Sequence, residues 1–151
     1  MKPAEPSLAA VLGTAARGAV AAMAMSGLRK LTTGLGLVRQ TPPEEIAREG
    51  LPGLIARVPL DRRAEAVELA HWAYGAAGGA AYALVAPSRG RPAWAGPLYG
   101  LVLWAVFERV VAPLLGLARA EERPATERLA IAADHVLYGA VVAGGGRPQR
   151  P

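Results

Sequence analysis

The sequence predicts an all-α membrane protein: a bundle of four transmembrane helices built from two parallel helical-hairpin repeats. Three observations favour this fold. Long apolar segments carry few charges, no strand pattern is present, and one short motif occurs twice, as HWAYGA at 71–76 and HVLYGA at 135–140. About 20 apolar residues, each rising 1.5 Å, cross a bilayer core of ~30 Å. A soluble helical bundle rich in alanine is the alternative interpretation.

Four spans are expected within one integral membrane domain of residues 1–143. They cover about residues 8–38, 66–86, 94–117 and 128–144, and residues 144–151 are expected to be a disordered tail. The first segment is longer than the bilayer requires, which a tilt or an interfacial extension would absorb. It has no clean cleavage site, so we interpret it as a retained span rather than a signal peptide. The fourth span contains Asp134 and His135 and is supported mainly by its likeness to the second.

The connection between the first two spans has its own helix signals. Thr41 followed by PPEEIARE is typical of a capped helix start, and we expect a short helix ending at Gly50. Residues 51–60 are apolar, interrupted by proline and glycine, and too short to cross, so they belong at the membrane interface or over the helix ends. Asp61 and Thr126 are expected to cap the second and fourth helices.

The duplication extends beyond the repeated motif. GLVR at 36–39 matches GLAR at 116–119, and at the same separation Arg29 falls on Arg109. Each half is then span, loop, span, which gives both halves the same orientation in the membrane. Basic residues are more frequent in the first and third connections, which favours a cytoplasmic location for these two. Chance similarity between helices rich in alanine and glycine is the alternative.

Small residues predict close helix contacts. Gly75 and Gly79, and Gly96 and Gly100, form GxxxG pairs, and Ala140 with Gly144 forms a similar pair. Small side chains let backbones approach each other in lipid. The pattern supports a tightly packed bundle.

Composition excludes several classes of function. The chain has no cysteine, which rules out disulfides, cysteine-bound metals and thiol nucleophiles. Its net charge of +5 comes from arginines scattered through connecting segments, so we expect no nucleic-acid partner. No hydrolase, phosphate-binding, dinucleotide-binding or zinc-protease motif is present, and we expect neither an enzyme nor a metal site.

The polar residues inside the spans are predicted to lie at one depth. Arg29, Arg109, His71 and His135 all fall roughly 10 Å inside the same end of the bundle. An unpaired charge at such depth costs about 3 kcal/mol or more, so these groups should face inward and pair. The predicted buried polar cluster comprises Arg29, Glu68, His71, Tyr74, Glu108, Arg109, Asp134, His135 and Tyr138. Ser26 is expected to bond back to its own helix, and Trp72 to face lipid or the interface.

Four interpretations of this cluster remain open. It is a neutralised network that fixes helix register, a proton relay or pH sensor, a haem site with His71 and His135 as axial ligands, or a metal site that adds Glu68 and Asp134. The two tyrosines lie three residues after each histidine, where they either bond to the imidazole or simply pack.

Several motifs together resemble those of YagU-like proteins, a family of small bacterial inner-membrane proteins of unknown function. The likeness covers most of residues 14–143 and is carried by Arg17-Gly18, PPEEI at 42–46, AHWAYGAAGGAAY at 70–82 and HVLYGA at 135–140. It implies a multi-pass protein of the bacterial inner (plasma) membrane and supplies no catalytic residues or cofactor.

We therefore expect a non-enzymatic structural or envelope-homeostasis protein whose cluster responds to pH. The alternatives are a small transporter or proton-conducting protein, and a haem-binding electron carrier. The expected partners are the lipid bilayer and either a second copy or another membrane protein.

Overall fold

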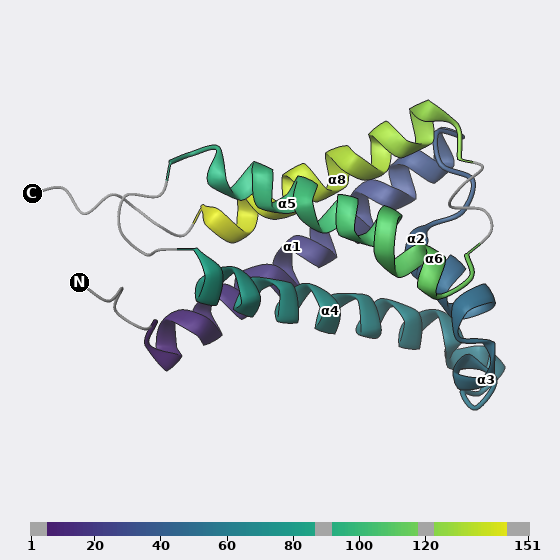
Figure 1. The fold of residues 1–151 in the computed structure, drawn as a ribbon. Coiled ribbons are helices and arrows are strands. Elements are labelled where there is room, and N and C mark those ends of the chain that lie inside the picture. Colours follow the sequence, from purple (N-terminus) through teal and green to yellow (C-terminus); the bar gives the residue numbers. More distant parts are fainter. Residues whose placement is uncertain (1–5, 87–91, 118–122, 145–151) are drawn as a thin grey trace, which may run out of the picture.

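The computed structural model describes residues 6–86, 92–117 and 123–144, and within these ranges every regular element is helical. The all-α prediction is confirmed. Four long helical stretches run back and forth along the molecule (Figure 1). They are α1 (Leu8–Gly34), α4 (Arg63–Val85), α5 (Ala95–Val106) continued by the π-helical turn η3 (Phe107–Val111) and α6 (Ala112–Leu114), and α8 (Ala125–Ala143).

Short elements gather at one end of the molecule, where α1 ends and α8 begins (Figure 1). They are α2 (Pro42–Glu45), the π-helical turn η1 (Ile46–Gly50), α3 (Pro52–Ile55) and the 3-10 turn η2 (Leu60–Arg62). The predicted start at Thr41 is confirmed, because its backbone N–H donates to Glu44 Oε2 at 3.1 Å in a capping box. The helix ends at Gly50 as predicted, although its last turn is π rather than α.

Two predicted caps are wrong. Asp61 lies within η2, and α4 begins after Arg62 without a side-chain cap. Thr126 lies inside the first turn of α8, which starts one residue earlier after Pro124. Proline fixes the extended backbone before the helix, so the helix begins directly behind it without a hydroxyl cap.

The ends of α1 and α6 have the same local geometry. Among the described residues, Gly36 and Gly116 are the glycines with positive φ, at 71° and 66°. The N–H after each glycine reaches back to a carbonyl five residues earlier: Leu37 N to Thr32 O at 2.9 Å and Leu117 N to Ala112 O at 3.0 Å. Glycine adopts this left-handed turn without a steric penalty and so ends both helices.

The helices pack as two antiparallel pairs. α1 packs on α4, α5 packs on α8, and the pairs meet chiefly where α1 also contacts α8 (Figure 1). Glycines make both pair contacts: a Cβ added to Gly18 would overlap the carbonyl oxygen of Gly75, and one added to Gly139 would overlap that of Gly96. The backbones therefore touch directly, as the GxxxG pairs predict.

Two helical stretches in the described ranges are long and apolar enough to cross a membrane, Leu8–Gly34 and Ala95–Leu114. The helices α4 and α8 have 23 and 19 residues but fall short of that apolar character. Of the expected disordered tail, residues 145–151 lie outside the described residues. The predicted span 8–38 corresponds to α1, which ends four residues earlier because Gly36 turns the chain.

Candidate functional site

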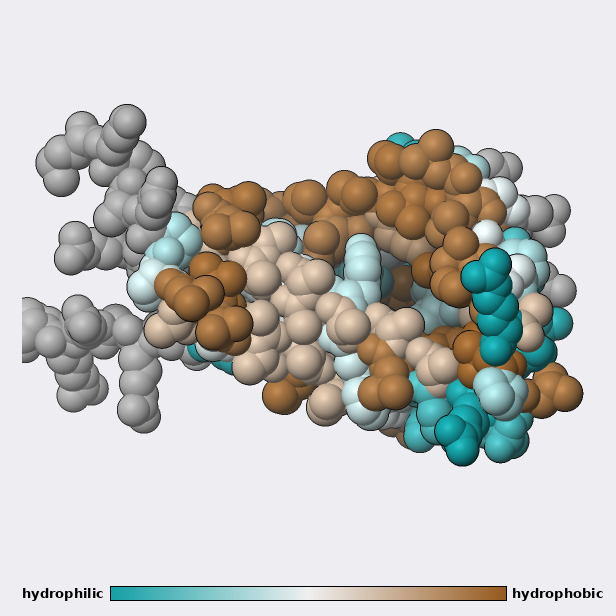
Figure 2. All heavy atoms as spheres, turned by 90° about the horizontal axis from the view of Figure 1, so that it is seen from below, coloured by the Kyte–Doolittle hydropathy of each residue, from teal (hydrophilic) through white to brown (hydrophobic). Residues whose placement is uncertain are grey.

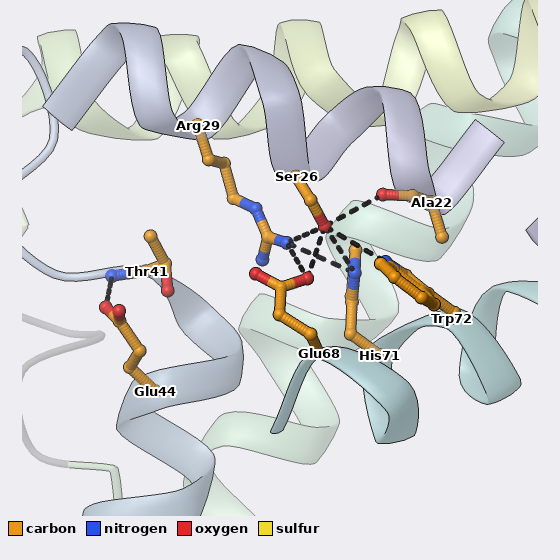
Figure 3. Close-up of polar contacts among 8 residues, drawn as sticks. All are labelled: Ala22, Ser26, Arg29, Thr41, Glu44, Glu68, His71 and Trp72. Atoms are coloured by element: carbon orange, nitrogen blue, oxygen red, sulfur yellow. Dashed lines mark hydrogen bonds and ion pairs between the residues drawn. The ribbon is translucent and has the colours of Figure 1, made fainter. Parts of the chain in front are cut away.

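Ser26 joins the side chains of α1 and α4 into one network (Figure 3). Arg29 Nη2 donates to Ser26 Oγ at 2.8 Å and to His71 Nδ1 at 3.1 Å. The Ser26 hydroxyl lies 2.6 Å from Glu68 Oε2, and Trp72 Nε1 donates to it at 3.3 Å. Arg29 and Glu68 also form an ion pair of 3.8 Å. Glu68, His71 and Arg29 are thus brought together as predicted.

Helical spacing explains this convergence. Ser26 and Arg29 are three residues apart on α1, and Glu68 and His71 are three apart on α4, so each pair shares a face. Ser26 and Trp72 belong to this network, although the predicted cluster does not include them. Ser26 does reach Ala22 O at 3.1 Å, as expected, but it is also the centre of the network. Its position on the face of Arg29 was the available signal.

The two histidines have opposite tautomers, as assigned from their bonding partners. A guanidinium only donates, so His71 Nδ1 accepts from Arg29 and the neutral ring has its proton on Nε2. His135 Nδ1 lies 2.8 Å from the carbonyl oxygen of Ile131, which only accepts, so Nδ1 carries a proton and, in the neutral ring, Nε2 does not. His71 therefore presents an N–H at Nε2, and His135 presents a lone pair there.

Both histidines line one cavity between the helical pairs. Its volume is about 80 Å³, and its polar lining residues are Arg29, His71, Tyr74, Asp134, His135 and Tyr138. One water needs roughly 10–15 Å³ by the same measure, so several waters fit. Figure 2 shows a hollow on the α4 side of the molecule, between its apolar surface and its hydrophilic end.

Two buried polar atoms beside this cavity have no hydrogen-bond partner among the described residues: Asp134 Oδ1 and Arg29 Nε. Asp134 is 4% exposed and Arg29 is 6% exposed. Arg29 forms its ion pair with Glu68, and Asp134 forms no ion pair among the described residues. The large majority of buried side-chain polar atoms are normally bonded, so these atoms point to a proton, ion, water or ligand in the cavity.

The tyrosines of the two motifs have different surroundings. Tyr138 donates its hydroxyl hydrogen to the Gly75 carbonyl at 2.6 Å, so it joins α8 to α4 rather than bonding to an imidazole. Tyr74 lines the cavity but is 59% exposed. Tyr99, which the sequence analysis did not select, makes a second such bridge by donating to Gly78 O at 2.7 Å.

Glu108 belongs to a second cluster rather than to the predicted one. Arg123 donates through Nη1 to Glu108 Oε1 at 2.5 Å and through Nη2 to Glu45. All three side chains are buried, and Arg128 Nε approaches Glu108 Oε2 to 3.8 Å from the partly exposed side. Burial raises the pKa of the Glu45 carboxyl above its usual value, against the opposing effect of Arg123. This cluster fastens α2 and η1 to η3.

Arg109 was predicted to be buried, and this prediction is wrong because its side chain is exposed. Phe107, two residues earlier, lines the cavity instead. The separation of 80 residues that matches Gly36 to Gly116 does not hold in the middle of the helices. There Gly18 and Gly96, which both pack on a motif glycine, are 78 apart.

The second half therefore has two more residues between Gly96 and Gly116 than the first half has between Gly18 and Gly36. The π-helical turn η3 lies within this longer interval. Each added residue turns the following side chains by about 100° around the axis. Arg109 consequently lies on a different face of its helix from the face that Arg29 occupies on α1. The separation of 80 residues between matching positions applies again only at the glycine turn that follows, Gly116. Sequence matching at a fixed separation has no means of showing such a turn.

Within the described ranges, His, Asp and Glu side chains form no group of three suited to hold a metal ion. Comparison of the chain with known protein families, curated proteins and solved structures found no match.

Proposed function

We propose that this chain is a multi-pass integral membrane protein in which α1, α4, the α5–α6 stretch and α8 all cross the bilayer. The two apolar stretches support this, because only 28% and 22% of the residues in their apolar windows are buried within the chain. The core helix of a soluble protein would be mostly buried. Figure 2 shows apolar surface over much of one face, with hydrophilic residues gathered at one end. The bacterial inner membrane is the location that the YagU-like motifs imply.

We further propose that the two helical pairs are parallel repeats. Three features of each pair support the proposal: a glycine contact between the helices, a left-handed glycine after the first helix, and the repeated HxxYGA motif on the second. With both helices of each pair crossing the bilayer, the two halves have the same orientation.

For the function, we propose a non-enzymatic protein of structural or envelope-homeostasis type whose central cavity binds a proton and so responds to pH. The single observation that carries this is Asp134, a buried carboxyl with an unbonded oxygen on a cavity lined from both pairs. A network that only fixed helix register would satisfy its own polar atoms. The groups that face Asp134 across the cavity are Arg29, His71, Tyr74, His135 and Tyr138, with Glu68 behind Arg29.

Infrared titration tests this proposal. The protein is placed in lipid nanodiscs, and the C=O band of protonated carboxyl groups is followed against pH in the wild type, Asp134→Asn and Asp61→Asn. Asp61 lies on the exposed turn η2 and is the matched control. We expect a titrating buried carboxyl that only Asp134→Asn removes. Identical spectra for the wild type and Asp134→Asn would refute proton binding at this site.

Proton conduction is the second candidate, and the tautomers favour it. His71 and His135 present a donor and an acceptor at Nε2 and line the same cavity, the arrangement that a relay through water requires. Liposomes containing the protein and a pH-sensitive dye measure the flux. A relay predicts that Asp134→Asn and His135→Phe each lower the flux at least tenfold. Flux at the level of empty liposomes in the wild type would exclude conduction.

The geometry does not support a haem-binding electron carrier. A cavity of about 80 Å³ is far below the roughly 300–1,000 Å³ of sites that hold cofactors and other small molecules. In addition, Nδ1 of His71 accepts from Arg29, which leaves the proton on the ring nitrogen that an axial ligand would use. A Soret band in the purified protein that disappears in His135→Ala would restore this candidate.

A further inference from the structure

An apolar groove adjoins the cavity that holds Asp134 and the two histidines. It has a volume of about 310 Å³ and lies between residues 51–58 and one face of α4, where Leu51, Leu54 and Ile55 face Val67 and Ala70. Leu51 and Leu54 are exposed at its outer side. Under the proposed membrane placement, hydrocarbon can enter the groove laterally from the lipid.

The groove and the cavity share four lining residues: Pro43, Ile46, His71 and Tyr74. The two spaces are therefore neighbours on either side of these residues. The lining of the groove is almost wholly apolar, whereas the adjacent cavity adds the buried polar groups of Arg29, Asp134 and His135. Such a site matches an amphiphile with a single hydrocarbon chain.

Charge decides which head group fits the polar end. Arg29 is paired with Glu68 at 3.8 Å and bonded to Ser26 and His71, so its charge is compensated locally. Asp134 retains an unbonded Oδ1 in the cavity wall. An anionic head group would add a further negative charge beside Glu68 and Asp134, whereas a cation compensates Asp134.

Hydrogen bonding favours an ammonium over other cations. A primary ammonium has three donors and no acceptor. The cavity offers two acceptors that no donor among the described residues occupies, Asp134 Oδ1 and the Nε2 lone pair of neutral His135. Dispersion contacts with the apolar side chains of the groove then hold the hydrocarbon chain.

Resting on the membrane placement and on the accessible Asp134 of the proposed function, we propose that the groove and cavity together bind a lipophilic primary amine. Its hydrocarbon chain lies along α4 against residues 51–58, and its ammonium group lies at Asp134. The protein would thereby recognise cationic single-chain amphiphiles in the membrane.

Binding of tritiated dodecylamine to the protein in nanodiscs tests this inference, with empty nanodiscs to subtract partition into lipid. We expect saturable binding that unlabelled dodecylamine displaces and dodecanoate, of the same chain length, does not. Asp134→Asn should weaken the affinity at least tenfold, while Asp61→Asn should leave it unchanged. Val67→Trp, which fills the groove, should abolish binding but preserve the infrared titration of Asp134.

Three results would overturn the proposal: no saturable binding of dodecylamine, saturable binding of dodecanoate in preference to it, or wild-type affinity in Asp134→Asn. The infrared titration separates this failure from that of the proposed function. If Asp134 titrates but dodecylamine does not bind, the proton site stands without an amphiphile. If dodecylamine binds but no carboxyl titrates, the amphiphile site stands without a pH response.

Discussion

Tyr138 on α8 donates its hydroxyl hydrogen to the backbone carbonyl of Gly75 on α4, with 2.6 Å between the two oxygens. The tyrosine of the second HxxYGA motif thus touches the glycine of the first. Gly78, one turn after Gly75 on α4, leaves room for the Tyr138 side chain, since a Cβ at this position would come within 2.6 Å of the Tyr138 hydroxyl. This contact joins the two helical pairs.

Removing the bridging hydroxyl should loosen the two pairs. Tyr138→Phe deletes one hydrogen bond between buried groups, so we expect stability to fall by about 0.5–1.5 kcal/mol. The Gly75 carbonyl keeps its place in the α4 ladder, which limits the loss. Thermal unfolding in detergent measures the change, with Tyr74→Phe as control because that side chain is largely exposed. Equal midpoints for both variants would show that the bridge contributes nothing.

The glycine contact between α5 and α8 should tolerate no added methyl group. In Gly139→Ala the new Cβ would overlap the Gly96 carbonyl oxygen, a backbone atom that moves only if the helices separate. Overpacking of this kind costs roughly 1–3 kcal/mol. Gly27→Ala is the matched control, since nothing lies within 4 Å of a Cβ there. We expect Gly139→Ala alone to lower the unfolding temperature, and equal effects would contradict the contact.

Local signals predicted much of this fold. The cap at Thr41 followed from a hydroxyl, two prolines and a glutamate in a fixed order, and the structure contains that capping box. The close approach at Gly75 and Gly96 followed from small residues at helical spacing. These features depend only on neighbours in the sequence, so the residues alone determine them.

Features that depend on distant parts of the chain escaped prediction. Arg123 stands in a charged loop that looks solvated, yet it is buried between Glu45 and Glu108, which come from other parts of the chain. No local pattern marks that pairing. The orientation of Arg109 depends on the π-helical turn that contains it, and the sequence around that turn is compatible with a regular α-helix.

Arg123 should matter more for stability than either of its carboxylate partners. Arg123→Gln leaves Glu45 and Glu108 buried together without their shared cation, and breaking a buried pair in this way costs about 3–5 kcal/mol. Glu45→Gln leaves a balanced pair of Arg123 and Glu108, so its cost should be far smaller. Unfolding of the two single variants and of the double variant measures the difference. If Glu45→Gln were as damaging as Arg123→Gln, the shared-cation arrangement would be wrong.

The pH dependence of stability should include a contribution from Glu45. Burial raises the pKa of its carboxyl in the folded protein, so the folded state holds this proton more tightly than the unfolded state. The contribution is fully present below the unfolded pKa, about 4.3, and declines as the pH rises through the raised folded pKa. Glu45→Gln does not titrate and lacks this decline. Its stability relative to the wild type should therefore increase as the pH rises above the unfolded pKa of about 4.3.

Denaturant unfolding of the wild type and Glu45→Gln at a series of pH values measures that difference directly. Subtracting one curve from the other cancels groups common to both proteins, Asp134 included, because distant sites contribute additively. Glu65→Gln is the control for loss of a glutamate outside the Arg123 cluster, since Glu65 lies exposed in the first turn of α4. A difference for Glu45→Gln that falls with rising pH would mean that Arg123 outweighs burial, and that the Glu45 carboxylate is stabilised by its partner rather than penalised by its surroundings.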